Sequence, residues 1–102
     1  MKLSDRVRGF LKMTGHYADS AVYLAEHGYD DEYVQRLTAE IGTAKNSKQK
    51  AEGQGLLAQA YLYRGQLSQA LEEFEKTPVE SLPKPMDSVL VNNYILCLFL
   101  HI

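Results

Sequence analysis

The chain has few of the residues on which many chemical functions depend. Its 102 residues include one cysteine and no tryptophan, and its three histidines, His16, His27 and His101, are far apart. Cys97 alone cannot form an internal disulfide, and no histidine stands at a metal-ligand spacing from it. We therefore expect no bound metal or other cofactor, and we expect Cys97 to act as a small apolar side chain in a reducing, intracellular environment.

The chain also has no large excess of positive or negative charge. Eleven lysines and arginines stand against 13 aspartates and glutamates, giving a formal net charge of -2, and the one basic cluster, at 45–50, has no interleaved aromatic residues. Asp5, Arg6 and Arg8 interrupt the region where a signal peptide needs its apolar stretch, and no segment approaches the roughly 20 apolar residues of a membrane helix. These features predict a soluble cytoplasmic protein that binds no nucleic acid and does not insert into a membrane.

Alternating apolar and polar residues, the pattern of a half-buried strand, are absent as well. Apolar residues recur at helical spacing instead, in segments separated by glycine or proline. The segment at 31–45 is either a separate helix or the continuation of the preceding helix, bent at Gly28. The pattern predicts an all-α fold with helices at about 4–13, 16–28, 31–44, 48–64 and 67–76 and a last helix that starts at Asp87 or Ser88.

A helix-turn-helix pattern occurs twice in the chain, at an interval of 65 - 15 = 50 residues. Gly15 corresponds to Gly65 at the turn, and Ser20 corresponds to Ala70 in the helix that follows. A glycine permits a tight turn, and a small residue lets two antiparallel helices approach closely. Gly53 lowers helix stability by about 1 kcal/mol relative to alanine, as does Gly55, so the first turns of the 48–64 helix should fray unless something packs closely there.

The second copy resembles the tetratricopeptide repeat, a helix-turn-helix unit of about 34 residues. Gln54 stands in place of the common tryptophan and Thr77 in place of the late alanine. The resemblance implies a short right-handed α-solenoid of antiparallel helix pairs. It divides the chain into an atypical repeat at about 4–46, whose second helix would be lengthened, a best repeat at 51–83, and the first helix of an incomplete repeat at 88–102. The matching residues are Leu57, Ala58, Tyr61, Gly65, Leu67, Ala70, Phe74 and Pro83.

A narrower resemblance involves the order of the segments. A lengthened second helix, then AYLYRGQLSQALEEF, then SVxxNNxxxCL is similar to the C-terminal repeat region of a subunit of the TRAPP vesicle-tethering complex. This resemblance implies a role in vesicle transport.

The tetratricopeptide resemblance also implies a binding groove, because the first helices of such repeats line a concave surface. Tyr63 falls at a groove position, whereas Tyr61 falls at a packing position. A mixed polar and aromatic groove suits an extended peptide or a helix of a partner. We predict that the groove residues are Gln59, Tyr63, Asn92 and Asn93.

The C-terminal segment YILCLFLHI is apolar on every face of a helix, which is typical of a segment buried on all sides. No later helix in this sequence covers it, and a repeat helix normally needs a neighbour. The segment therefore predicts a surface that meets a partner or a second copy, made of Tyr94, Ile95, Leu96, Leu98, Phe99 and Leu100.

We thus expect a scaffold or adaptor without enzymatic activity that binds a peptide or helix of a protein partner within a larger assembly. The consecutive carboxylates at 30–32 and 72–75 point in different directions on a helix and have no nucleophile beside them, so they predict solvated surfaces. Two alternatives stay open: a structural subunit that forms a homodimer through its C-terminal helix, and a fragment of a longer repeat protein of the vesicle-tethering type.

Overall fold

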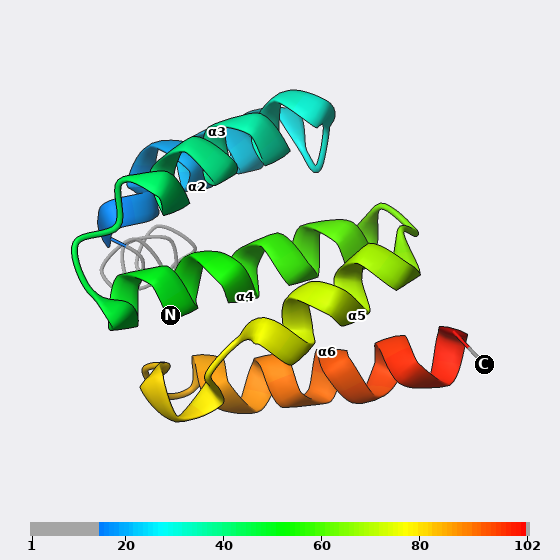
Figure 1. Cartoon of the computed structure of the whole chain (residues 1–102). Helices are drawn as coiled ribbons and strands as arrows, with labels where there is room; N and C mark the ends of the chain where they lie inside the picture. Colours follow the sequence, from blue (N-terminus) through cyan, green and yellow to red (C-terminus); the bar gives the residue numbers. More distant parts are fainter. Residues whose placement is uncertain (1–14, 102) are drawn as a thin grey trace, which may run out of the picture.

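The described part of the chain, residues 15–101 of a computed structural model, consists of helices and connecting turns without a strand (Figure 1). The predicted helix at about 4–13 lies outside the described residues. The all-α prediction is confirmed for the part described. In chain order the elements are the 3₁₀ helix η1 (Gly15–Tyr17), α2 (Ala18–His27), α3 (Asp31–Gly42), α4 (Ser47–Tyr63), α5 (Leu67–Lys76), the 3₁₀ helix η2 (Val79–Ser81) and α6 (Met86–His101).

The helix boundaries follow from local chemistry. Asp30 caps α3, because its carboxylate accepts the backbone N–H of Tyr33 at 2.8 Å, and the side chain of Asn46 caps α4 in the same way. Gly65 joins α4 to α5 with φ = 78°, a conformation that glycine adopts at little cost. The last helix begins at Met86, one or two residues before the predicted start at Asp87 or Ser88.

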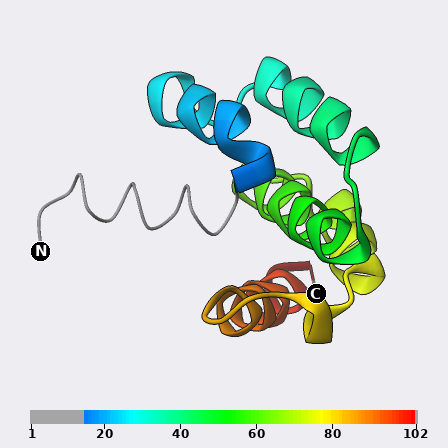
Figure 2. The same cartoon turned by 90° about the vertical axis from the view of Figure 1, so that its left-hand side faces the viewer.

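Helix α4 lies at the centre of the molecule. Figures 1 and 2 show the α2–α3 hairpin on one side of it and α5 and α6 on the other, and α4 contacts α3, α5 and α6. Its buried residues therefore point in almost every direction around the helix. The Cα radius of gyration is 13.0 Å, close to the roughly 12 to 13 Å expected of a compact domain of this length.

Several of the residues that carry the tetratricopeptide resemblance belong to the hydrophobic core around α4 and α5. Ala58 and Ala70 are completely buried, Phe74 is buried, and Tyr61 and Leu67 pack against the same core. Helix α6 returns alongside and runs in the direction of α4 (Figure 1). The described helices form a compact arrangement. A right-handed α-solenoid stays a prediction.

The lengthened second helix is wrong. The chain breaks at Gly28, where φ is 81°, and restarts at Asp31, so α2 and α3 are separate antiparallel helices (Figure 1). The physical reason is the cap at Asp30 together with the burial of Tyr33 and Leu37, which requires α3 to fold back onto α4. The alternation of first and second helices that the 4–46 repeat needed is therefore broken. The narrower resemblance stays a prediction.

Gly53 and Gly55 mark two close approaches on opposite sides of α4. A side-chain carbon at Gly53 would clash with Tyr17 and Ile41, and one at Gly55 would clash with Leu90 of α6. The first turns of α4 are thus held by neighbours on both sides. The absence of side chains lets η1, α3 and α6 pack against the backbone of α4.

Candidate functional site

Helix α6 is fixed to the molecule along one stripe. Met86, Leu90 and Cys97 are buried, and the Cys97 thiol donates to the backbone carbonyl of Leu67 at 3.6 Å. Burial raises the pKa of that thiol, so Cys97 stays protonated and serves as a small apolar side chain. The spacing of these residues, four and seven apart, places them on one face of the helix.

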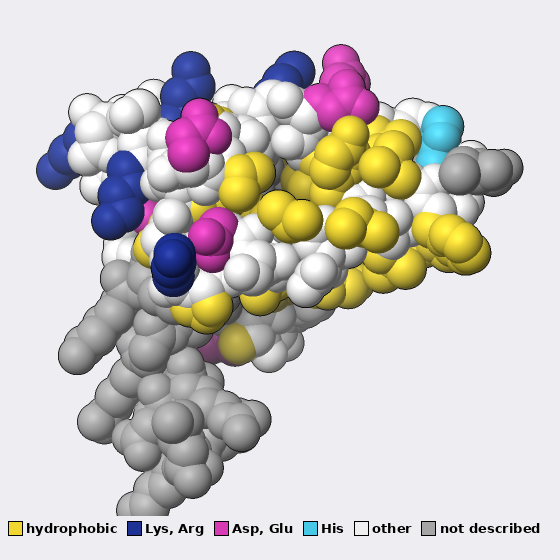
Figure 3. Space-filling model, turned by 90° about the horizontal axis from the view of Figure 1, so that it is seen from below, with side chains coloured by type: hydrophobic (Ala, Val, Ile, Leu, Met, Phe, Trp, Pro, Cys, Tyr) yellow, Lys and Arg dark blue, Asp and Glu magenta, His cyan; other side chains and the backbone are white. Residues whose placement is uncertain are grey.

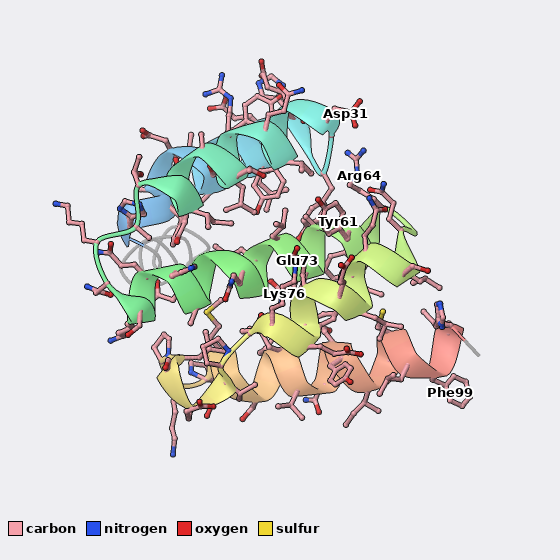
Figure 4. The ribbon with its side chains drawn as sticks, viewed as in Figure 1. Asp31, Tyr61, Arg64, Glu73, Lys76 and Phe99 are labelled. Carbon is pink, nitrogen blue, oxygen red and sulfur yellow. The ribbon has the colours of Figure 1, made fainter. Side chains whose placement is uncertain are left out.

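The opposite side of α6 is apolar and exposed. Phe99 is 77 % exposed and Ile95 is 59 % exposed. Figure 3 shows hydrophobic side chains gathered on the surface formed by this helix, and Figure 4 shows Phe99 pointing away from the other helices. We call this surface the α6 outer face, and it consists of Val89, Val91, Ile95, Leu96, Leu98, Phe99 and Leu100.

The α6 outer face is large for a single protein. Its seven side chains expose roughly 600 Å², at the upper end of the largest apolar patch on a typical monomer. Five of the six residues predicted for this surface are exposed, and the structure adds Val89 and Val91 to them. Tyr94 differs, because its ring is partly buried and stacks on Phe74 with a centroid distance of 5.8 Å.

A shallow pocket of about 240 Å³ lies at the N-terminal end of the α6 outer face. Val79 of η2 forms one wall, and the first turns of α6 form the other. We call it the Val79 pocket. Its apolar walls and polar rim come from Val79, Asp87, Ser88, Val91 and Asn92.

The four predicted groove residues do not line this pocket together. Asn92 lines it, whereas Asn93 is partly buried and its amide nitrogen has no hydrogen-bond partner among the described residues. Gln59 is partly buried in α4, and Tyr63 is 57 % exposed with its ring 5.1 Å from that of Tyr29, in the turn between α2 and α3. The groove of Gln59, Tyr63, Asn92 and Asn93 therefore stays a prediction.

A second hollow, of about 410 Å³, lies between α2 and α3. It is charged and exposed: the Arg36 guanidinium lies 4.7 Å from the centre of the Tyr23 ring and 3.5 Å from the carboxylate of Glu32. Tyr23 donates to the Asp30 carboxylate at 2.7 Å, and this bond, with the backbone N–H of Tyr33, lowers the pKa of Asp30. These contacts join α2 to α3.

The end of α4 is joined to the same hairpin by Arg64. Its guanidinium donates to the Tyr29 carbonyl at 2.9 Å and pairs with the carboxylate of Asp31 (Figure 4). Asp31 is highly exposed, so the ion pair itself contributes little to stability. Arg64 therefore connects the α2–α3 turn to the C-terminal end of α4.

Two buried ionisable groups lie on the side of α4 that faces η1. Burial raises the pKa of Tyr17 to about 12, and its hydroxyl donates to the carbonyl of Gln49. Burial also raises the pKa of Glu52, with Lys48 and His16 opposing the shift. None of these groups belongs to α6. The seven residues of the α6 outer face are themselves uncharged.

Residues 15–101 contain no group of three or more histidine, cysteine, aspartate or glutamate side chains placed to hold a metal ion. Over the same residues, no helix combines the length and the apolar character needed to cross a bilayer. Comparison with protein-family models, with curated proteins and with solved structures found no match to the chain. The candidate site therefore rests on the geometry of α6.

Sequence reasoning missed Val89 and Val91 of the α6 outer face, and it missed Val79, Asp87 and Ser88 of the Val79 pocket. Because α6 is apolar on every face, its periodicity does not indicate which side chains meet the core. One signal was present in the sequence: Leu90 and Cys97 are spaced from Met86 so that the three lie on one side of the helix. That side is the buried one, and the other side chains of α6 lie outside it.

Proposed function

We propose that this chain is a non-catalytic interaction module, a scaffold or adaptor in a protein assembly, that docks onto another protein chain through the α6 outer face. The observation that supports the proposal is that the apolar C-terminal part of α6, residues 94–100, is covered by the described residues along one side only. Exposed apolar area of this size and continuity is typical of a protein interaction site.

The way α6 is held suits this role. Leu90 packs against the backbone of α4 at Gly55, and Cys97 is tied to α5, so the helix is rigid before any partner arrives. A rigid surface loses little conformational entropy on binding, so more of the burial free energy remains as affinity. A helix that presents side chains at spacings of three and four residues is best matched by another helix.

Most of the binding free energy should come from few residues. Phe99 is the largest and most exposed side chain of the α6 outer face, and central aromatic anchors commonly dominate an interface. The neighbouring Ile95 and Leu98 would exclude water around it. We place the site here rather than at Tyr63, which already has Tyr29 as a ring neighbour.

A photoreactive phenylalanine analogue tests the proposal in cells. One variant carries it at position 99, and a matched control carries it at Gln35, an exposed residue of α3 on the far side of the molecule (Figure 1). Irradiation should give covalent adducts with a protein chain from position 99 in several-fold greater yield than from position 35. Equal yields from the two positions would contradict the proposal.

A further inference from the structure

The α6 outer face has two ends of different shape. At its C-terminal end Phe99 projects from the surface, and at its N-terminal end the Val79 pocket is hollow. The side chains that border the hollow on α6 are small, Ser88, Val91 and Asn92, whereas those around Phe99 are large. A projection and a hollow on one face can fill each other only if a second, reversed face is laid against it.

We propose that the occupant of the α6 outer face is a second copy of this chain, with the two α6 helices packed antiparallel about a two-fold axis at Ile95. This inference rests on the proposed docking role of α6 and names the partner. Each Phe99 ring would enter the Val79 pocket of the other copy. An interface of this kind is self-complementary, as a two-fold dimer requires.

The helical geometry gives the proposal its register. Phe99 lies four residues beyond Ile95, and Val91 lies four residues before it, so reversal about Ile95 brings the two to the same level. At 3.6 residues per turn, Ser88, Val91, Asn92 and Ile95 form a diamond on the helix surface, the arrangement that accepts a side chain of a facing helix. Three of these four residues already line the Val79 pocket.

Charge and area both permit the pairing. Residues 88–100 include no charged side chain. Asp87 also lines the Val79 pocket, but its two copies would lie roughly 24 Å apart along the antiparallel helices, so the two faces meet without close repulsion between like charges. If each copy buries its roughly 600 Å², the interface covers up to roughly 1,200 Å² in total, the lower end of specific interfaces. We expect a reversible dimer that dissociates on dilution.

The mass of the purified protein in solution provides the first test. Sedimentation equilibrium should give twice the monomer mass of 11.5 kDa at about 100 µM and a fall toward the monomer on dilution. Phe99→Glu and Val91→Glu should each raise the dissociation constant at least 30-fold, and Thr38→Glu, at an exposed site on α3, should leave it unchanged. Circular dichroism of each variant establishes that it is folded.

Disulfide trapping tests the register. Reversal about Ile95 also brings residue 98 of one copy within one residue of the level of residue 91 of the other. In a Cys97→Ser background, a mixture of the Val91→Cys and Leu98→Cys variants should therefore oxidise mainly to the mixed dimer. Two copies of residue 91 would lie about 12 Å apart along the helices, too far for a disulfide. Ile95→Cys alone should be trapped as a dimer.

A folded native chain that is monomeric at 100 µM overturns the inference, as does a dimer that Phe99→Glu leaves intact or a dominant disulfide between two residues 91. These outcomes leave the docking role of α6 standing if position 99 still forms adducts with a different protein in cells. If the adducts from position 99 were lost as well, both the dimer and the docking role of α6 would be contradicted.

Discussion

Substitution of Gly53 by alanine tests the packing around α4. Two opposing effects set the result. Alanine favours a helix over glycine by about 1 kcal/mol. The added carbon would meet Tyr17 and Ile41 in a filled interior, and overpacking of this kind costs about 1 to 3 kcal/mol.

Tyr17 decides which effect is larger. The ring is completely buried, and its hydroxyl donates to the carbonyl of Gln49, so it cannot move aside without losing that hydrogen bond, a further cost of about 1 kcal/mol. We expect Gly53→Ala to lower the free energy of unfolding by about 1 to 3 kcal/mol. For a domain of this size the midpoint of thermal unfolding would fall by roughly 4 to 24 °C, measured by far-ultraviolet circular dichroism.

Gly42→Ala is the matched control. Gly42 is also helical, but a side-chain carbon there meets nothing within 4 Å, so the helix preference acts alone and should stabilise the chain by up to about 1 kcal/mol. Gly55→Ala should fall between the two, because the contact is with the end of the Leu90 side chain, which can rotate. If Gly53→Ala proves as stable as Gly42→Ala, the close approach at η1 is not a feature of the protein.

Three further outcomes follow from the described contacts. Asp30→Asn should destabilise the chain at neutral pH, and its effect should shrink in acid: the pKa of Asp30 is lowered in the folded chain, so its stabilisation is complete above the unfolded pKa of about 4 and is lost as the pH falls through the folded value, which urea titrations at a series of pH values would follow. Glu52→Gln should have the opposite sign, because the pKa of Glu52 is raised by burial; the native chain should lose stability as the pH rises from about 4.5 toward the folded value, and the variant should lack that loss. Phe74→Ala removes a buried ring and should cost about 3 to 5 kcal/mol in chemical denaturation, and a cost below 1 kcal/mol would contradict its place in the core.

The sequence predicts the α4–α5 hairpin well because the signals there are local. Gly65 requires a turn, and Ala58 and Ala70 are small where the two helices cross, so spacing alone places the contacts. The α2–α3 boundary is less certain from sequence, because Gly28 is compatible with a bent helix as well as with a turn. What decides it is burial of Tyr33 and Leu37 against α4, a contact distant in sequence.

The α6 outer face was predictable only in part, because composition is a local signal and the packing of α6 depends on contacts distant in sequence. Composition shows that the C-terminal half of α6 is strongly apolar, but it does not show which side faces α4 and α5. Tyr94 illustrates the difference: it was expected on the outer surface, and its ring stacks on Phe74 instead. The Val79 pocket could not be predicted, because it depends on how η2 lies against the first turns of α6.

The most direct test of the central claim, that the α6 outer face is covered by another protein chain, is hydroxyl-radical footprinting of side chains in intact cells and in dilute purified protein. The account predicts that oxidation of Phe99 and Ile95, relative to the exposed His27 of α2, falls several-fold in cells compared with the dilute protein. Equal relative oxidation of Phe99 in the two samples would contradict it.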